Sequence, residues 1–246
     1  MITENTYYYF KSIISSENCQ KIINLGKSEI EKMKQNGLDT AGTTFGDNHK
    51  QANPDLQPLN DKTFEEIENK NTFVRDSQVA WLNDQWLYDL ILPYINQANI
   101  EAGWKYDLDW YETFQFTIYN PGGFYGWHSD GASCHLSKYR RHIPGVSETK
   151  NNNKVLSNHT VYDKFVGKIR KLSMTLNLNV PGEYEGGNLK FDLGPHTKNN
   201  RYHECEEIRP QGSLIVFPSY FYHQVTPITR GTRYSLVLWC LGNPLR

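Results

Sequence analysis

Apolar residues recur along this chain in two different patterns, one after the other. In the first part, two stretches carry apolar residues at spacings of three and four, which is typical of amphipathic helices. One begins at an N-cap supplied by Ser15 or Ser16 and stops at Asn36-Gly37, and the other covers Trp86 to Ile100. In the second part, short β-branched and aromatic segments alternate with Gly, Pro and Asn. That pattern predicts strands of a barrel or sandwich.

The predicted strands lie mostly in the second part, and the long polar stretch from Leu38 to Lys62 is expected to be a loop. We therefore expect a mainly β fold with flanking helices. The extended segments are Thr6–Ile14, Phe73–Leu82, Asp107–Tyr119, Tyr125–His128, Lys171–Val180, Gly187–Asp192, Ser213–Phe217 and Thr232–Leu241.

A length of 246 residues is compatible with one domain. We expect residues 1–103 to form a helical support region and residues 104–242 to form the β core. Residues 131–168 interrupt this core with a basic, Asn-rich insertion that is too polar to be buried. Because the insertion follows His128 and Asp130 directly, we expect it at the mouth of any site that they form.

Charge and hydropathy exclude several classes of function. A net charge of -1 gives no electrostatic reason to expect nucleic acid or an anionic membrane as a partner. No apolar run approaches the roughly 20 residues that span a bilayer, and the N-terminus does not resemble a secretory signal, so a cytoplasmic protein is expected. The four cysteines lack CxxC spacing, which favours reduced thiols over a zinc knuckle or a disulfide framework.

One histidine and one carboxylate stand two residues apart after a strand-like run. In a strand, His128 and Asp130 would project to the same side. His223 could arrive from a later strand and complete two histidines and one carboxylate around a metal ion. This ligand set leaves positions open and is associated with non-haem Fe(II) oxygenases. The other histidines lie in polar segments and are expected to be solvated: His49, His135, His142, His159, His196 and His203.

An arginine lies within the last apolar strand. Alternation places Arg233, Ser235, Val237 and Trp239 on one face and Tyr234, Leu236, Leu238 and Cys240 on the other. A buried guanidinium needs an anion, and its planar fork matches a carboxylate. One interpretation is a structural salt bridge to an internal Asp or Glu. The other, which we favour, is that Arg233 anchors the distal carboxylate of an organic acid that chelates the metal.

Five motifs occur in an order that resembles a known family. They are Tyr119-x-x-Gly122-x-x-Tyr125-x-x-His128-x-Asp130, the segment from Arg170 to Asn179, the segment from Glu183 to Phe191, the segment from Gly212 to His223, and Gly231-Thr-Arg233-Tyr-Ser235-Leu-Val-Leu-Trp239. Together they resemble the Fe(II)/2-oxoglutarate dioxygenases of the prolyl 4-hydroxylase superfamily, and among these the bacterial PKHD-type hydroxylases.

The resemblance implies a double-stranded β-helix core and a set of site residues. His128, Asp130 and His223 would bind iron, and Arg233 would bind the C5 carboxylate of 2-oxoglutarate with Ser235 beside it. It suggests that Tyr119 donates its hydroxyl to the co-substrate, with Asn177 as a further candidate. Tyr125, Trp127 and Trp239 are expected to line the substrate pocket.

The resemblance also implies a reaction that consumes O2 and 2-oxoglutarate, releases succinate and CO2 and hydroxylates an unactivated C–H bond. The substrate would be a peptidyl proline or an amino acid, with ascorbate as a candidate reductant; the oligomeric state stays open. Two other readings remain. The same core could be a binding module that holds metal and ligand without turnover, or it could hold zinc for hydrolysis, although no HExxH motif is present.

Overall fold

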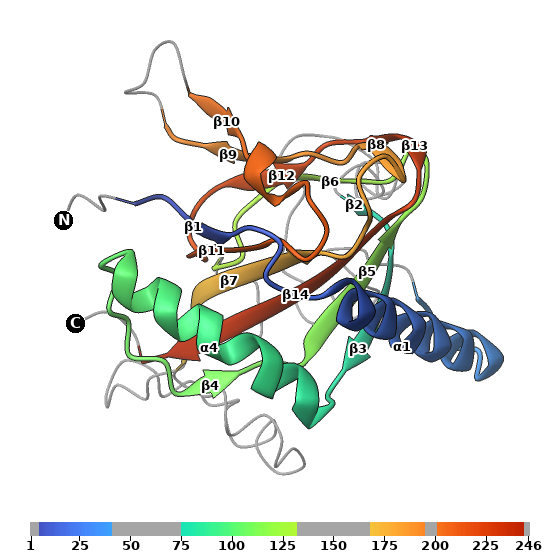
Figure 1. Ribbon diagram of the computed structural model, residues 1–246, viewed down its shortest axis with the longest axis horizontal. Coiled ribbons are helices and arrows are strands. Elements are labelled where there is room, and N and C mark those ends of the chain that lie inside the picture. Colours follow the sequence, from blue (N-terminus) through green and yellow to red (C-terminus); the bar gives the residue numbers. More distant parts are fainter. Residues whose placement is uncertain (1–4, 41–74, 132–167, 195–200, 244–246) are drawn as a thin grey trace, which may run out of the picture.

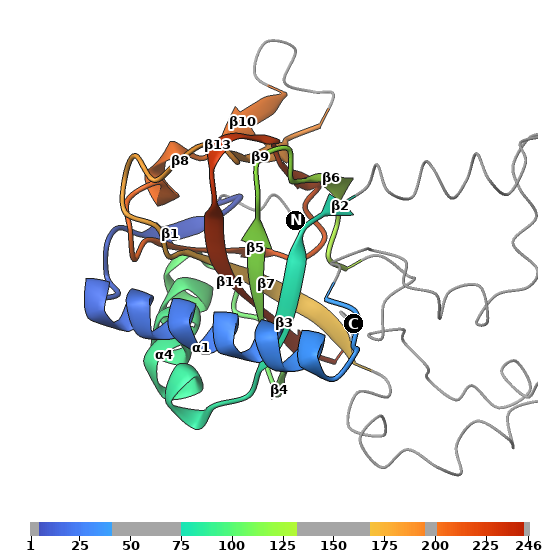
Figure 2. The same cartoon turned by 90° about the vertical axis from the view of Figure 1, so that its right-hand side faces the viewer.

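The computed structural model describes residues 5–40, 75–131, 168–194 and 201–243. In this part of the chain two β-sheets face each other, and helices α1 (Ser16–Gln35) and α4 (Gln85–Glu101) pack against the outer face of the larger sheet (Figure 1, Figure 2). None of the helices in these residues is both long and apolar enough to cross a membrane.

The larger sheet has seven strands and carries most of the hydrophobic core. Its order is β1 (Tyr8–Phe10), β11 (Leu214–Pro218), β7 (Ile169–Asn177), β14 (Arg233–Gly242), β5 (Phe114–Tyr119) and β3 (Gln78–Leu82), and β4 (Trp110–Tyr111) pairs with β14. Neighbouring strands in this order are antiparallel. Alternate residues of the central strands therefore face the helices, and the others face the second sheet.

The smaller sheet has five strands, in the order β10 (Tyr202–Glu204), β9 (Leu189–Asp192), β12 (His223–Val225), β6 (Phe124–His128) and β2 (Arg75–Asp76). Strands β8 (Tyr184–Gly186) and β13 (Ile228–Gly231) form a separate two-stranded ribbon, and a short 3-10 helix, η2, covers Glu206–Ile208.

Both predicted helices are present, and the first has the predicted ends. The Ser15 side chain accepts a hydrogen bond from the backbone N–H of Asn18 at 3.2 Å, so Ser15 is the N-cap. The helix ends at Gln35, and Gly37 adopts the left-handed conformation, with φ of 68°.

The predicted alternation along the last strand is confirmed. Tyr234, Leu236, Leu238 and Cys240 belong to the core that the helices cover. Arg233 and Ser235 are also buried, but they lie outside that apolar core. They therefore face the smaller sheet.

Several predicted strand boundaries were wrong. The segment Thr6–Ile14 forms a strand only at Tyr8–Phe10, and Ser12 has a positive φ of 51° that ends it. The segment Asp107–Tyr119 is split into β4 and β5: both pair with β14, but the register shifts by one residue between the pairs Cys240–Tyr111 and Val237–Gln115. Strand β7 starts at Ile169 and ends at Asn177, earlier than predicted.

Four strands of three or four residues were absent from the predicted set because they are too short to show alternation, although His223 was expected on a later strand. These are β8, β10, β12 and β13. One consequence concerns His203, which lies in β10 and hydrogen bonds to the Tyr7 hydroxyl at 2.7 Å instead of being a solvated loop residue. The described residues do not include the other five histidines that were expected to be solvated. Nor do they include Cys134 of the insertion at 131–168, or nearly all of that insertion.

Candidate metal centre

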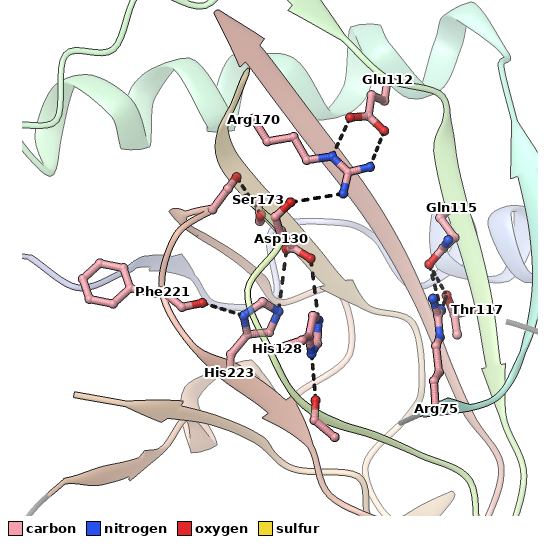
Figure 3. A network of polar contacts seen from close by, with 12 residues as sticks. Arg75, Glu112, Gln115, Thr117, His128, Asp130, Arg170, Ser173, Phe221 and His223 are labelled. Carbon is pink, nitrogen blue, oxygen red and sulfur yellow. Dashed lines mark hydrogen bonds and ion pairs between the residues drawn. The ribbon is translucent and has the colours of Figure 1, made fainter. Parts of the chain in front are cut away.

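Three side chains that are far apart in sequence converge at one point of the smaller sheet (Figure 3). The Nε2 atoms of His128 and His223 each lie 3.6 Å from a carboxylate oxygen of Asp130. All three donor atoms are within 4.8 Å of one another. Two imidazoles and one carboxylate at this spacing could hold a metal ion.

Strand pairing brings the two histidines together. His128 is the last residue of β6, His223 is the first of β12, and the two are direct register partners. Asp130 was expected on the same strand as His128, but β6 ends at His128. The chain turns there, and the N–H of Gly131 bonds to the carbonyl of Ser219 at 2.8 Å. It is this turn that brings the Asp130 carboxylate to the histidines.

Backbone carbonyls fix the orientation of both imidazole rings. The Nδ1 atom of His128 lies 2.8 Å from the carbonyl oxygen of Gly126, and that of His223 lies 2.9 Å from the carbonyl oxygen of Phe221. Nδ1 therefore carries the proton and donates it to the carbonyl. The lone pair of each Nε2 is then directed at Asp130, which is the arrangement that metal-binding histidines commonly show.

The protonation states suit a metal site. Burial opposes ionisation of Asp130, but His223, His128 and Arg170 outweigh it and hold the pKa of the Asp130 carboxyl well below its usual range. Burial, followed by the charge of His128, lowers the pKa of His223 to about 4. At neutral pH the site therefore presents an ionised carboxylate and a neutral His223 imidazole.

A buried ion pair supports Asp130 from the larger sheet. The Arg170 guanidinium binds both carboxylate oxygens of Glu112 at 2.6 Å and donates to the backbone carbonyl of Asp130 at 3.4 Å. It also lies 4.0 Å from the centre of the Trp239 ring. Sequence reasoning did not find this role. The available signal was a second arginine within an apolar strand.

Arg233 is the largest of the fully buried side chains, with an exposed fraction of 2 %. Among the described residues its only hydrogen bond is from Nη1 to the Ser235 hydroxyl at 3.3 Å, and its Nε has no partner there. The guanidinium carbon lies 5.6 Å from the centre of the Tyr119 ring, and Tyr119 is its register partner on β5. No carboxylate of the described residues pairs with Arg233, so the structural salt bridge considered for it is absent there.

A glycine keeps the space beside Arg233 open. Gly187 has a φ of 61°, and a Cβ built on it would lie 3.0 Å from the Arg233 Cδ and 2.3 Å from Ile228. A buried cation with an orphaned donor, neutral neighbours and a glycine beside it has the character of a binding site for an anion.

Asn177 lies beside Ser235 in the register of β7 and β14. Its amide nitrogen already donates to the carbonyl of Arg209 at 2.7 Å, and its oxygen accepts from the Tyr184 hydroxyl at 3.4 Å. These contacts hold η2 and β8 against the larger sheet. A role for Asn177 in binding a co-substrate stays a prediction.

The three predicted pocket residues differ in their surroundings. The Tyr125 ring stacks on His128 with centroids 3.5 Å apart. Trp239 is buried against Arg170 and Trp81, and its indole N–H has no hydrogen-bond partner within the described part of the chain. Trp127 lies beside Tyr202 of β10, with centroids 5.2 Å apart.

The described geometry coincides with a family match. A family model described as the 2OG-Fe(II) oxygenase superfamily matches residues 114–241, which include all three metal-site residues and Arg233. The chain belongs to the 2OG-Fe(II) oxygenase superfamily. Its donor set, neutral imidazole nitrogens and a carboxylate, fits the ferrous ion of that superfamily.

Relatives in this superfamily include bacterial hydroxylases. A PKHD-type hydroxylase of Stenotrophomonas maltophilia is 34% identical over 125 residues, which are 51% of this chain and 41% of that protein. The chain thus spans about two-fifths of the length of this curated relative.

Solved structures show the same fold. The collagen prolyl hydroxylase of Paramecium bursaria Chlorella virus-1, in complex with 2OG, has a TM-score of 0.57, is 16% identical and covers 98% of this chain and 99% of its own. A Trichoplax adhaerens prolyl hydroxylase, in complex with a peptide fragment of the hypoxia inducible factor, has a TM-score of 0.56, is 15% identical and covers 96% and 84%. The predicted fold, a double-stranded β-helix core with flanking helices, is confirmed.

Proposed function

We propose that this member of the 2OG-Fe(II) oxygenase superfamily is an Fe(II)- and 2-oxoglutarate-dependent dioxygenase that hydroxylates an unactivated C–H bond. The observation that supports it best is that two parts of a site, here called half-sites, lie on facing sheets. The first half-site is formed by the donor atoms of His128, Asp130 and His223 on the smaller sheet. The second is Arg233 on the larger sheet, a buried guanidinium without an anionic partner among the described residues.

His128, Asp130 and His223 would bind the iron through Nε2, a carboxylate oxygen and Nε2. The carbonyls of Gly126 and Phe221 hold the two rings in the required tautomer, and Arg170 steadies the backbone at Asp130. When bound, Fe(II) with 2-oxoglutarate and O2 supplies an oxidant that is able to replace C–H by C–OH, with succinate and CO2 as products.

Arg233 would bind the C5 carboxylate of 2-oxoglutarate through its unsatisfied donors, with the Tyr119 hydroxyl and Ser235 beside it. Ser235 already contacts Arg233 Nη1, so its hydroxyl restrains the guanidinium before the co-substrate arrives. Preorganised donors of this kind lower the cost of binding because no side chain has to be reoriented.

Tyr125, Trp127 and Trp239 would line the path of the substrate. A prolyl residue in a peptide is the substrate that the prolyl hydroxylase neighbours suggest, one of which is bound to a peptide. A free amino acid is the second candidate. Ascorbate as a reductant and a cytoplasmic location stay predictions.

Anaerobic titration tests the proposal directly. Fe(II) and 2-oxoglutarate added together should give a weak visible charge-transfer band, and admission of air should yield succinate. Arg233→Ala should weaken 2-oxoglutarate binding by about 10-fold or more, as expected for loss of a charged hydrogen bond. The same variant should leave iron binding largely unchanged.

Two results would contradict these assignments. A protein that binds Fe(II) and 2-oxoglutarate but forms no succinate with any substrate would be a binding module. An Arg233→Ala variant that loses the metal but keeps 2-oxoglutarate would reverse the roles given to the two half-sites.

A further inference from the structure

A third buried guanidinium, after those of Arg170 and Arg233, lies near the candidate metal centre but not in contact with it. Arg75, in β2 of the smaller sheet, has an exposed fraction of 7 %. Its Nε donates to the Ser77 hydroxyl at 2.8 Å. Its Nη2 donates to Gln115 Oε1 at 2.8 Å and lies 3.4 Å from the Thr117 hydroxyl (Figure 3).

All of these partners are neutral. Within the described part of the chain, no carboxylate lies within ion-pair distance of Arg75, and no hydrogen bond is formed by its Nη1. Arg170, by contrast, is neutralised by the bidentate contact with Glu112. A buried guanidinium without an anion lowers the stability of the fold. A neutral side chain at position 75 could link the two sheets equally well.

Arg75 lies one aromatic ring away from the metal centre. Its guanidinium carbon is 4.6 Å from the centre of the Tyr125 ring, and that ring stacks on His128 at 3.5 Å. Its partner Thr117 is the register partner of Ser235, which contacts Arg233. Arg75 and Arg233 thus each contact one member of the Thr117–Ser235 pair.

The charges of the complete site do not balance without a further anion. Bound Fe(II), Arg233 and Arg75 together carry four positive charges, and Asp130 and the 2-oxoglutarate dianion carry three negative ones. The Arg170–Glu112 pair is neutral. One positive charge remains in a low-dielectric interior, where an uncompensated charge is least favourable.

We infer that Arg75 binds a carboxylate of the substrate, so that the enzyme acts on an acid: a free amino acid, the C-terminal residue of a peptide, or a residue next to an acidic side chain. This inference rests on the proposed function and narrows its substrate class. Nη1 is the free donor for the carboxylate, while Nε and Nη2 keep the guanidinium in place.

Matched acid and amide probes test the inference. Binding is measured by calorimetry without O2, on the Co(II) protein saturated with 2-oxoglutarate, so that no turnover is needed. The pairs are L-proline and L-prolinamide, a peptide ending in proline with its C-terminal acid or amide, and an amidated peptide with Glu or Gln beside an internal proline. In at least one pair the acid should bind about 10-fold or more tightly, and the pair that discriminates identifies the source of the carboxylate.

Two variants separate anchoring of the substrate from support of the fold. Arg75→Gln should weaken the acid about 10- to 100-fold and the amide less than about 3-fold, with 2-oxoglutarate affinity unchanged within the same limit. Gln115→Ala removes a partner of Arg75 but keeps the charge, so it should retain the preference for the acid.

Equal binding of acid and amide in every pair, including no measurable binding of any acid, would overturn the inference. So would an equal loss for acid and amide in Arg75→Gln, or a comparable loss of 2-oxoglutarate. The wild-type comparison decides the matter even if Arg75→Gln does not fold. Absence of succinate in air would contradict the proposed function alone, because these affinities are measured without turnover.

Discussion

At the scale of single residues, three buried arginines lie between or beside the sheets, and their charges are balanced in two different ways. Arg170 has a bidentate carboxylate, whereas Arg75 and Arg233 have only neutral oxygens among the described residues. A guanidinium keeps its charge at any physiological pH. The pairing therefore distinguishes Arg170, which is neutralised within the fold, from the two arginines for which we propose an anionic ligand.

The Arg170–Glu112 pair leads to a prediction about stability. Glu112→Gln should lower the unfolding free energy by about 3 kcal/mol, because it leaves a buried guanidinium without its counter-charge. Urea unfolding of both proteins measures the difference. Glu29→Gln is the matched control: the Glu29–Lys32 pair on α1 is largely exposed, so the change should cost less than about 0.5 kcal/mol. Equal effects of the two substitutions would contradict a structural role for Glu112.

His223 makes the stability of the metal-free protein depend on pH. Its pKa falls from 6.5 to about 4 on folding, chiefly through burial. Between these values the unfolded chain binds more protons than the folded one, so stability should decrease as the pH is lowered from 6.5 towards 4, by at most about 3 kcal/mol. Melting temperatures in a chelator across this range measure the effect. His223→Gln should flatten the profile, and an unchanged profile would show that other groups cause it.

The candidate site residues could be proposed from sequence, but the residues that support them could not. His128 and Asp130 follow a strand-like run, His223 was expected on a later strand, and Arg233 stands in an apolar strand. The contact of Glu112 with Arg170 joins residues 58 positions apart, and strand register creates it. No local pattern contains that information.

At the scale of elements, long periodic segments were predictable and short ones were not. The cap at Ser15, both long helices and the two faces of β14 follow from patterns that extend over ten residues or more. Strands β10 and β12 have three residues each and exist because neighbouring strands pair with them. Tertiary pairing, and not local preference, decides such strands.

The packing of α1 on the larger sheet leads to a prediction at this scale. A Cβ at Gly26 would lie 2.2 Å from the Phe116 ring, so the helix approaches β5 through a glycine. Gly26→Ala should destabilise the protein by about 1–3 kcal/mol through overpacking, although alanine is the better helix former. Thermal unfolding measures it.

Two further variants test the cause. Ser28→Ala, at an exposed position of the same helix, should be neutral or slightly stabilising. Phe116→Leu should reduce the additional cost of Gly26→Ala, because less of the ring remains to be displaced. Additive effects at positions 26 and 116 would contradict a direct clash.

At the scale of the whole molecule, the two half-sites lie on different sheets. His128 and His223 belong to strands of the smaller sheet, and Arg233, Ser235 and Tyr119 belong to the larger one. The domain boundaries proposed from sequence and the role of the insertion at 131–168 stay predictions.

This arrangement predicts ordered stabilisation by ligands. Metal alone should raise the melting temperature, and 2-oxoglutarate should raise it further only when metal is present. At a 100-fold excess over its dissociation constant, 2-oxoglutarate should add about 3 kcal/mol to the unfolding free energy. Arg233→Met should abolish the second increment, keep the first and itself stabilise the ligand-free protein, because it removes a buried uncompensated charge. Differential scanning fluorimetry with Co(II) measures all three. Full stabilisation by 2-oxoglutarate without metal would contradict the arrangement.

Gly187 shows that the size of one residue outside the candidate metal centre affects the position of Arg233. Because any side chain there would meet both the Arg233 stem and Ile228, the clearance beside Arg233 depends on one missing methyl group in the segment between β8 and β9. A larger residue would displace the Arg233 stem, so the proposed binding of 2-oxoglutarate should weaken. Position 187 thus offers a way to alter the proposed acid site without changing the candidate metal ligands.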